Sequence, residues 1–184
     1  KRQVVDSATK AFEKYDYTKA LEVTETFFWS FTDDYVELVK ERTYGKQGEE
    51  SANSAKAALG ITIHTILKLF APFVPFVSEE VWSWWQKGSV HNQAWPKPEE
   101  ITANKAISIK SLELVTNVLA EIRKAKTEKQ LSMKAEVLEL EIKAKNEDIE
   151  ILKKSEKDLI AAGIIKNLIY KNQDTELKLE IKLA

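Results

Sequence analysis

Two adjacent carboxylates stand out first as residues that could bind a metal ion or do acid–base chemistry. Asp33 and Asp34 lie inside an aromatic stretch, FFWSFTDDYVELVKERTYG, at residues 27–45. If this stretch is helical, adjacent side chains project about 100° apart, so the two carboxylates diverge and do not share one ion. We therefore expect a structural role for this pair.

The two histidines lack the neighbours that catalysis requires. His64 lies in a helix-like segment and His91 in a loop-like one, and neither belongs to a nucleophile or metal-ligand pattern. The chain has no cysteine, which excludes disulfides, thiolate ligands and a cysteine nucleophile. Its five glycines form neither a GxGxxG nor a Walker pattern. The sequence therefore predicts no catalytic residue, metal ligand or cofactor site in this chain.

Cations that could contact phosphate groups gather between residues 101 and 134. This segment holds seven Lys or Arg against three Asp or Glu, whereas the whole chain has a net charge of −1. A local basic patch matters more for phosphate contact than the total charge does. Cations near a helix C-terminus also favour the helix dipole without any partner, so both interpretations stay open. The candidates for RNA contact are Arg42, Lys46, Arg123, Lys124, Lys126, Lys129 and Lys134.

The composition favours long helices over a loop-rich β-structure. Of the 184 residues 43% are hydrophobic and 31% are charged, and only five glycines and four prolines interrupt them. The apolar runs are too short to span a bilayer, and the N-terminus has no signal-peptide core. We expect a soluble, cytoplasmic protein without membrane contact. Because the chain begins at Lys1 and not at a methionine, we also expect a fragment of something longer.

Apolar residues spaced three and four apart predict the helices that position these side chains. The expected helices cover residues 3–14, 18–44, 51–70, about 79–87 and about 104–130, the last starting near Asn104 and ending in IRKAKTEKQ. Pro72 and Pro75 should form a corner. Ser78 is the expected N-cap of the next helix, which should stop at Gly88. An indole of this helix, Trp82 or Trp85, should anchor the loop that follows.

After residue 131 the pattern changes from helical to strictly alternating. Leu138, Leu140 and Ile142 alternate with charged residues, which predicts a half-buried strand. A helix over 145–161 and two further strands should follow. The sequence therefore predicts a mainly α protein, with an antiparallel helical bundle over residues 1–130. A small β-α-β-β subdomain with a three-stranded antiparallel sheet should occupy residues 131–184.

Three stretches, in this order, resemble the C-terminal helical region of the valyl-tRNA synthetase family. They are ALEVTETFFWSFTDDYVELVKERTYG, SAKAALGITIHTILKLFAPFVPFVSEEVWSWW and GSVHNQAWP, and the likeness covers residues 10–130 or so. The segment IRKAKTE is similar to the helix that closes this region in the family, with Lys126 where arginine is common. The resemblance implies the helical-bundle fold of class I synthetase anticodon-binding domains.

The resemblance also implies a function in binding the anticodon region of valine tRNA. In such domains polar groups and aromatic stacking read unstacked bases, and basic residues hold phosphates. The intact enzyme, a monomer, would use ATP and Mg²⁺ to join valine to its tRNA and would edit misacylated threonine. Its catalytic and editing domains, and a helix contributing to anticodon contact, would precede Lys1. The alternative is a helical interaction module that docks other domains of a larger protein and binds no RNA.

Overall fold

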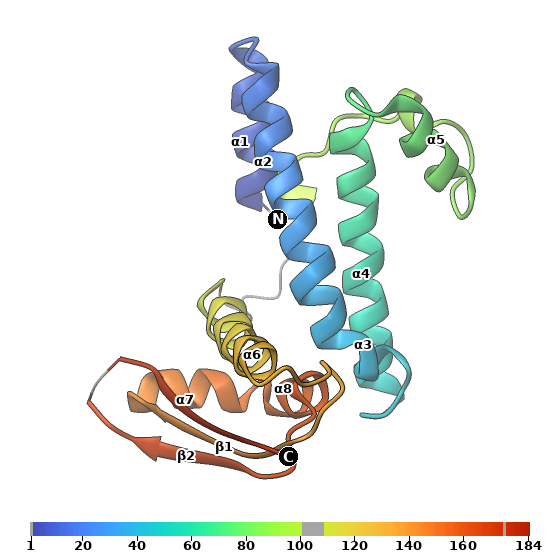
Figure 1. Ribbon diagram of the computed structural model, residues 1–184. Coiled ribbons are helices and arrows are strands. Elements are labelled where there is room, and N and C mark those ends of the chain that lie inside the picture. Colours follow the sequence, from blue (N-terminus) through green and yellow to red (C-terminus); the bar gives the residue numbers. More distant parts are fainter. Residues whose placement is uncertain (1, 101–108, 175) are drawn as a thin grey trace. The chain divides into compact units, whose positions relative to one another are not determined.

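The computed structural model describes residues 2–100, 109–174 and 176–184, which divide into two compact units. The first unit consists of Lys1–Val36 with Asn53–Ala103, and the second of Glu37–Ala52 with Asn104–Ala184. Helices predominate, and the described residues form one small C-terminal sheet, which confirms the predicted fold class (Figure 1). The predicted domain boundary after residue 130 stays a prediction. None of the described helices is both long enough and apolar enough to cross a membrane.

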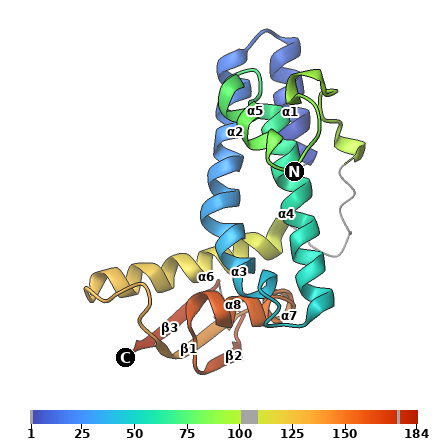
Figure 2. The ribbon, with the colours of Figure 1, turned by 90° about the vertical axis from the view of Figure 1, so that its right-hand side faces the viewer.

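The first unit begins with a helical hairpin, visible in Figure 2. Helix α1 (Arg2–Glu13) packs against α2 (Tyr17–Trp29), and Asp16 caps α2 by accepting a hydrogen bond from the backbone N–H of Lys19 at 3.0 Å. Tyr15 makes the reversal between them in the left-handed conformation, with a φ of 59°. The expected helix over residues 3–14 is confirmed.

The aromatic stretch is helical, but it changes type along its length. Helix α2 passes into a π-helical segment, η1 (Ser30–Val36), which is followed by α3 (Glu37–Thr43). A π-helix closes i→i+5 hydrogen bonds, so its side chains turn away from the positions that an ideal α-helix would give them. The rings of Phe27, Phe31 and Tyr35 nevertheless stack in sequence, with centroids 6.4 and 6.0 Å apart. Phe31 is buried and Phe27 and Tyr35 are half-buried, whereas Trp29 is 53% exposed, so only part of the aromatic stretch enters the interior.

Helix α4 (Glu49–Phe70) is followed by a corner and by α5 (Pro75–Ser83). The N-cap of α5 is Val74, so the prediction that Ser78 caps this helix is wrong. Proline fits the first helical turn because the N–H there has no intrahelical partner. The helix therefore begins before Ser78, which is buried within it, and it ends at Ser83, short of the expected stop at Gly88.

Trp82 anchors the loop after α5, as predicted. Its indole is 1% exposed and packs with Val90, which begins the short 3-10 helix η2 (Val90–Asn92). Glu79 fixes the same loop, because its Oε2 accepts hydrogen bonds from Ser89 Oγ at 2.9 Å and from the backbone N–H of Val90 at 3.0 Å. A second 3-10 helix, η3 (Pro98–Glu100), completes the described part of this unit.

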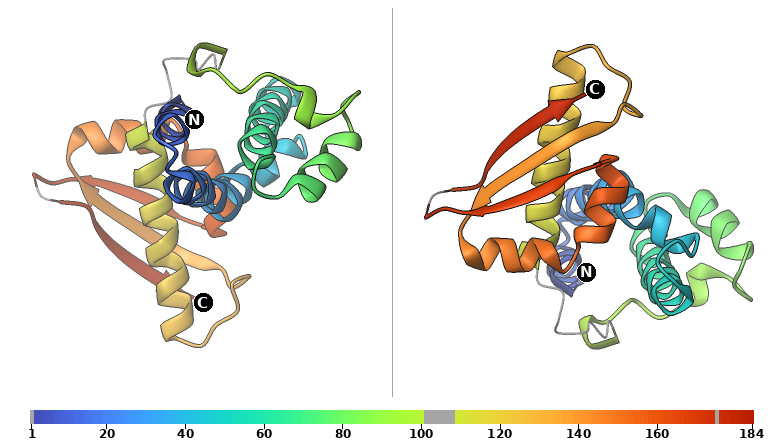
Figure 3. Two further views of the ribbon diagram at one scale, coloured as in Figure 1. Left: turned by 90° about the horizontal axis from the view of Figure 1, so that it is seen from above. Right: turned by 90° about the horizontal axis from the view of Figure 1, so that it is seen from below.

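The second unit is a small sheet with helices on one face. Strands β1 (Val137–Ala144), β2 (Leu168–Asn172) and β3 (Lys178–Leu183) are arranged in the order β2-β1-β3. Figure 3 shows α6 (Ile109–Glu128) and α7 (Asn146–Lys153) across one face of this sheet. Helix α8 (Glu156–Gly163) packs against α6. The expected start of α6 near Asn104 lies outside the described residues.

The sheet is mixed, so the prediction of an antiparallel sheet is wrong. Strand β1 pairs with β3 antiparallel but with β2 parallel, which places Leu140 opposite Leu168. The cause is the connection: α7 and α8 carry the chain back to the same end of the sheet, and such a crossover makes the next strand parallel. The single helix expected over residues 145–161 is correspondingly two helices, interrupted at Lys154 and Ser155.

Candidate nucleic-acid interface

The seven cations predicted to contact RNA all lie in the second unit, where the structure separates them into two groups. Arg42 and Lys126 are engaged within the fold. The side chains of the others are exposed: Lys46, Arg123, Lys124, Lys129 and Lys134.

Lys126 is only 2% exposed, although it carries a charge. It follows Ile122 by four residues on the buried face of α6, so its side chain enters the interior. Its Nζ donates hydrogen bonds to the carbonyl oxygens of Met133 at 3.1 Å and of Gly163 at 3.3 Å. Gly163 is the last residue of α8, where carbonyl groups lack helical partners and favour a cation. Burial lowers the pKa of Lys126 below its ordinary value of 10.5.

The loop after α6 is held by Lys126 through both its backbone and its side chain. The backbone carbonyl of Lys126 accepts a hydrogen bond from the N–H of Leu131 at 2.8 Å, and the ammonium group contacts Met133 two residues later. The loop also carries the exposed side chains of Lys129 and Lys134. Lys126 therefore positions two neighbouring cations.

Arg42 is paired with a buried carboxylate. Its Nη2 lies 3.3 Å from Oδ2 of Asp158, and the two side chains are 22% and 9% exposed. Gln47 donates to the other carboxylate oxygen, Oδ1, at 2.8 Å. Burial raises the pKa of Asp158, while Arg42 and Gln47 oppose that rise. The pair ties α3 to α8, whereas Lys46 stays exposed and forms an ion pair with Glu41.

The other residues singled out in the sequence lie in the first unit. Asp33 is exposed and Asp34 is half-buried in the π-helical segment. His91 Nε2 is 3.3 Å from a backbone carbonyl oxygen of α5, and His64 packs on the ring of Trp82 with centroids 4.7 Å apart. Within the described ranges, no three His, Asp or Glu side chains gather closely enough to hold a metal ion.

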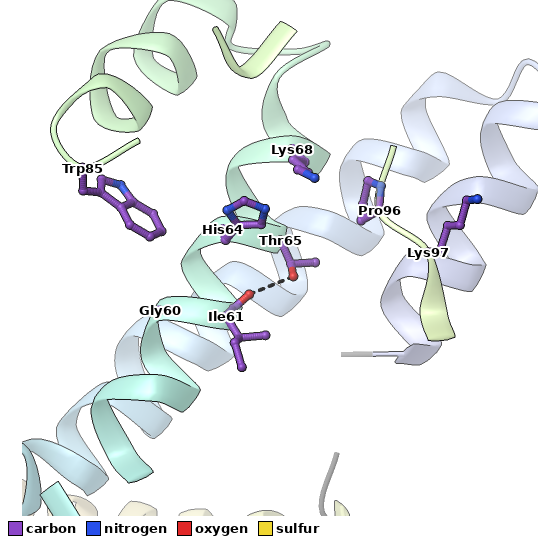
Figure 4. A pocket seen from close by; sticks show the side chains of 8 residues that line it. All are labelled: Gly60, Ile61, His64, Thr65, Lys68, Trp85, Pro96 and Lys97. Atoms are coloured by element: carbon purple, nitrogen blue, oxygen red, sulfur yellow. Dashed lines mark hydrogen bonds between the residues drawn. The ribbon is translucent and has the colours of Figure 1, made fainter. Parts of the chain in front are cut away.

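A pocket beside α4 was not predicted from the sequence. It has a volume of about 380 Å³, and its lining includes Gly60, His64 and Lys68 of α4 together with Trp85 and Lys97 (Figure 4). The three α4 residues recur every four positions and so share one face of the helix. That spacing was the one sign of the pocket in the sequence. Nothing in the sequence shows that Trp85 and Lys97 lie beside this face of α4.

The chain is similar to one domain family and to several enzymes. Residues 2–143 match the sequence model of the anticodon-binding domain of tRNA ligase. The chain is 47% identical to the valine–tRNA ligase of Thermobifida fusca (strain YX), across 99% of this chain and 20% of that protein. It is 45% identical to the valine–tRNA ligase of Salinispora tropica, across 98% of this chain and 23% of that protein. It therefore spans about a fifth of the length of these relatives.

Proposed function

Because this chain belongs to the family of anticodon-binding domains of tRNA ligases, we propose that it binds the anticodon region of valine tRNA as part of a valine–tRNA ligase. The observation that carries the proposal is the group of exposed ammonium groups at the end of α6 and in the loop after it, on Lys124, Lys129 and Lys134. Lysines that neutralise phosphates release counterions, which drives binding to nucleic acid.

In this proposal the cations divide their work. The exposed lysines hold the RNA backbone, with Arg123 and Lys46 as further exposed cations of the same unit. Lys126 acts indirectly by fixing the loop, since its ammonium group already has two carbonyl partners. Arg42 has a similar positioning role, because its guanidinium group forms an ion pair with Asp158.

We assign the ligation chemistry to the rest of the protein. In this proposal the intact enzyme, a cytoplasmic monomer, uses ATP and Mg²⁺ to activate valine in a catalytic domain and corrects errors in an editing domain of the same chain. The present chain contributes tRNA binding. This assignment follows from its match to the anticodon-binding domain and from the valine–tRNA ligases that it resembles.

The test replaces Lys124, Lys129 and Lys134 together by alanine in the full-length protein. The matched control replaces Lys153, Lys154 and Lys157, which are exposed in the same unit and change the net charge equally. Affinity for valine tRNA, measured across salt concentrations, should fall only in the first variant. Its salt dependence should flatten by about one in log–log slope for each phosphate that the variant leaves without a lysine. Equal affinity and slope in both variants would contradict this interface.

A helical interaction module remains the second candidate, because one observation favours it. Phe76, Val77 and Trp84 around α5 are 88%, 62% and 70% exposed, which is typical of surfaces that contact other proteins or domains. If the full-length protein binds valine tRNA no better than a tRNA with an exchanged anticodon, the proposal of anticodon binding is wrong. That result would favour the interaction module.

A further inference from the structure

We propose that the pocket beside α4 holds one unstacked nucleotide of the bound tRNA, an inference that rests on the proposed function. It concerns residues of the first unit, whereas the lysines of α6 belong to the second. The base would lie against Trp85, and its phosphate would lie between Lys68 and Lys97.

The aromatic wall of the pocket is the indole of Trp85, which is partly exposed and packs against neighbouring rings. Trp85 is 43% exposed, so part of its indole is accessible to a ligand. His64 meets it edge to face, with ring centroids 6.2 Å apart and planes at 76°. His64 also packs on the buried ring of Trp82, which supports the imidazole. A fixed and partly exposed indole is the platform on which single-stranded bases stack.

The charges of the pocket suit a phosphodiester. Lys68 comes from α4 and Lys97 from the segment after the Trp95 loop, so lysines from two different parts of the chain line the pocket (Figure 4). No acidic residue is among the described residues that line it. A concave surface with cations and no carboxylate attracts an anion.

The remaining lining residues leave space for the base and offer it a hydrogen-bond acceptor. The hydroxyl of Thr65 donates to the carbonyl oxygen of Ile61 at 2.8 Å, so toward a ligand it can only accept, for example from a base amino group. At Gly60 an added Cβ would meet no atom within 4 Å, which shows that the helix surface there faces open space. The volume of about 380 Å³ lies within the range of small-ligand pockets.

An RNA nucleotide fits this pocket better than a free nucleoside triphosphate does. Triphosphates are held by backbone N–H groups of a glycine-rich loop and by a metal ion. Here the polar groups are two ammonium groups, an imidazole and a hydroxyl beside an indole. This combination matches the recognition of single-stranded RNA, in which aromatic rings stack on bases and lysines hold the backbone.

The test fills the pocket with a negative charge. In the full-length protein, Gly60→Glu places a carboxylate on the pocket face of α4, one turn from His64, and Trp85→Ala removes the platform while leaving Gly60 intact. The control Ser54→Glu adds the same charge at an exposed position of the same helix. Binding of a valine tRNA transcript should weaken about tenfold in both pocket variants, the effect of losing one stacked base, and should be unchanged in the control. Chemical footprinting should show one nucleotide losing protection in the same two variants.

The outcomes separate this inference from the proposed function. If the wild type binds valine tRNA but both pocket variants bind and protect it as the control does, the pocket assignment is wrong while tRNA binding stands. If the wild type binds no valine tRNA, both are wrong. AMP serves as the free-nucleotide probe: saturation of the pocket by micromolar AMP, abolished by Trp85→Ala, would assign the site to a free nucleotide and overturn the RNA assignment.

Discussion

The ammonium nitrogen of Lys126 lies 3.3 Å from the carbonyl oxygen of Gly163, 37 residues further along the chain. Gly163 ends α8, and in the first turn of the same helix Asp158 pairs with Arg42 at 3.3 Å. A helix of eight residues is too short to be stable alone. Its place therefore depends on neighbours, and each of its ends has a cation from another helix.

Removing the amine of Lys126 should destabilise the second unit. Lys126→Met keeps most of the apolar volume but leaves the carbonyl oxygens of Met133 and Gly163 without this donor, at a cost of about 2 kcal/mol or more. Urea unfolding measures this change. The exposed neighbour Lys124 provides the control, since Lys124→Ala should change stability by no more than about 0.5 kcal/mol. Equal stabilities of the two variants would show that the buried contacts contribute little.

The stability of the protein should also respond to pH through Lys126. Because burial lowers the pKa of this amine in the folded state, the unfolded chain binds the proton more tightly. The free energy of unfolding should therefore rise with pH in the window that ends near the ordinary pKa of 10.5. Lys126→Met should lack this contribution, so the difference between wild type and variant should widen across the window. A difference independent of pH would contradict the lowered pKa.

Arg42→Ala should leave a buried carboxylate without its cation. We expect the free energy of unfolding to fall by about 3 kcal/mol at neutral pH. Removing one partner of a buried ion pair leaves the other charge buried without compensation for its desolvation. The loss should shrink below the ordinary pKa of Asp158, 3.8, where this carboxyl is protonated in both the folded and the unfolded state. Lys46→Ala, at an exposed cation nearby, is the control. A double-mutant cycle with Asp158→Asn measures the coupling, and additive effects would rule it out.

Gly163→Ala should be destabilising even though alanine suits a helix better than glycine. An added Cβ would lie 2.9 Å from side-chain atoms of Ile165 and 3.2 Å from Cδ1 of Ile122, too close for ordinary contact. Overpacking of this kind costs about 1–3 kcal/mol, more than the helical gain. Thermal unfolding measures the change, and Ile165→Val should restore part of the stability by removing the nearest methyl group. A more stable Gly163→Ala protein would mean that the interior adjusts freely.

The helices could be predicted from apolar spacing, but the role of Lys126 was missed for a specific reason. Its charge indicated a surface residue, whereas its position continues the buried stripe from Leu119 through Ile122. A long lysine can place its stem in the interior if carbonyl groups receive the amine. Those carbonyls belong to Met133 and Gly163, and their proximity depends on the tertiary structure.

The strands could also be predicted, but their pairing could not. Alternation along β1 correctly places Leu140 and Ile142 in the interior, but Leu138 is 41% exposed and Val137 is buried instead, next to an irregularity in the pairing with β3 between Val137 and Glu139. Alternation does not reveal which strands are neighbours or in which direction they run, because this depends on how α7 and α8 cross the sheet. The pocket beside α4 has the same limitation, since Trp85 and Lys97 meet there only through folding.

The central place of β1 decides where this protein can be divided for expression. A polypeptide ending at residue 143, the limit of the match to the domain family, would keep most of β1 but neither strand that pairs with it. Both of its edges would then present unpaired N–H and C=O groups, which promotes aggregation. A polypeptide ending at residue 130 would deprive Lys126 of both its carbonyl partners. A well-behaved C-terminal boundary therefore lies no earlier than Leu183, the end of β3.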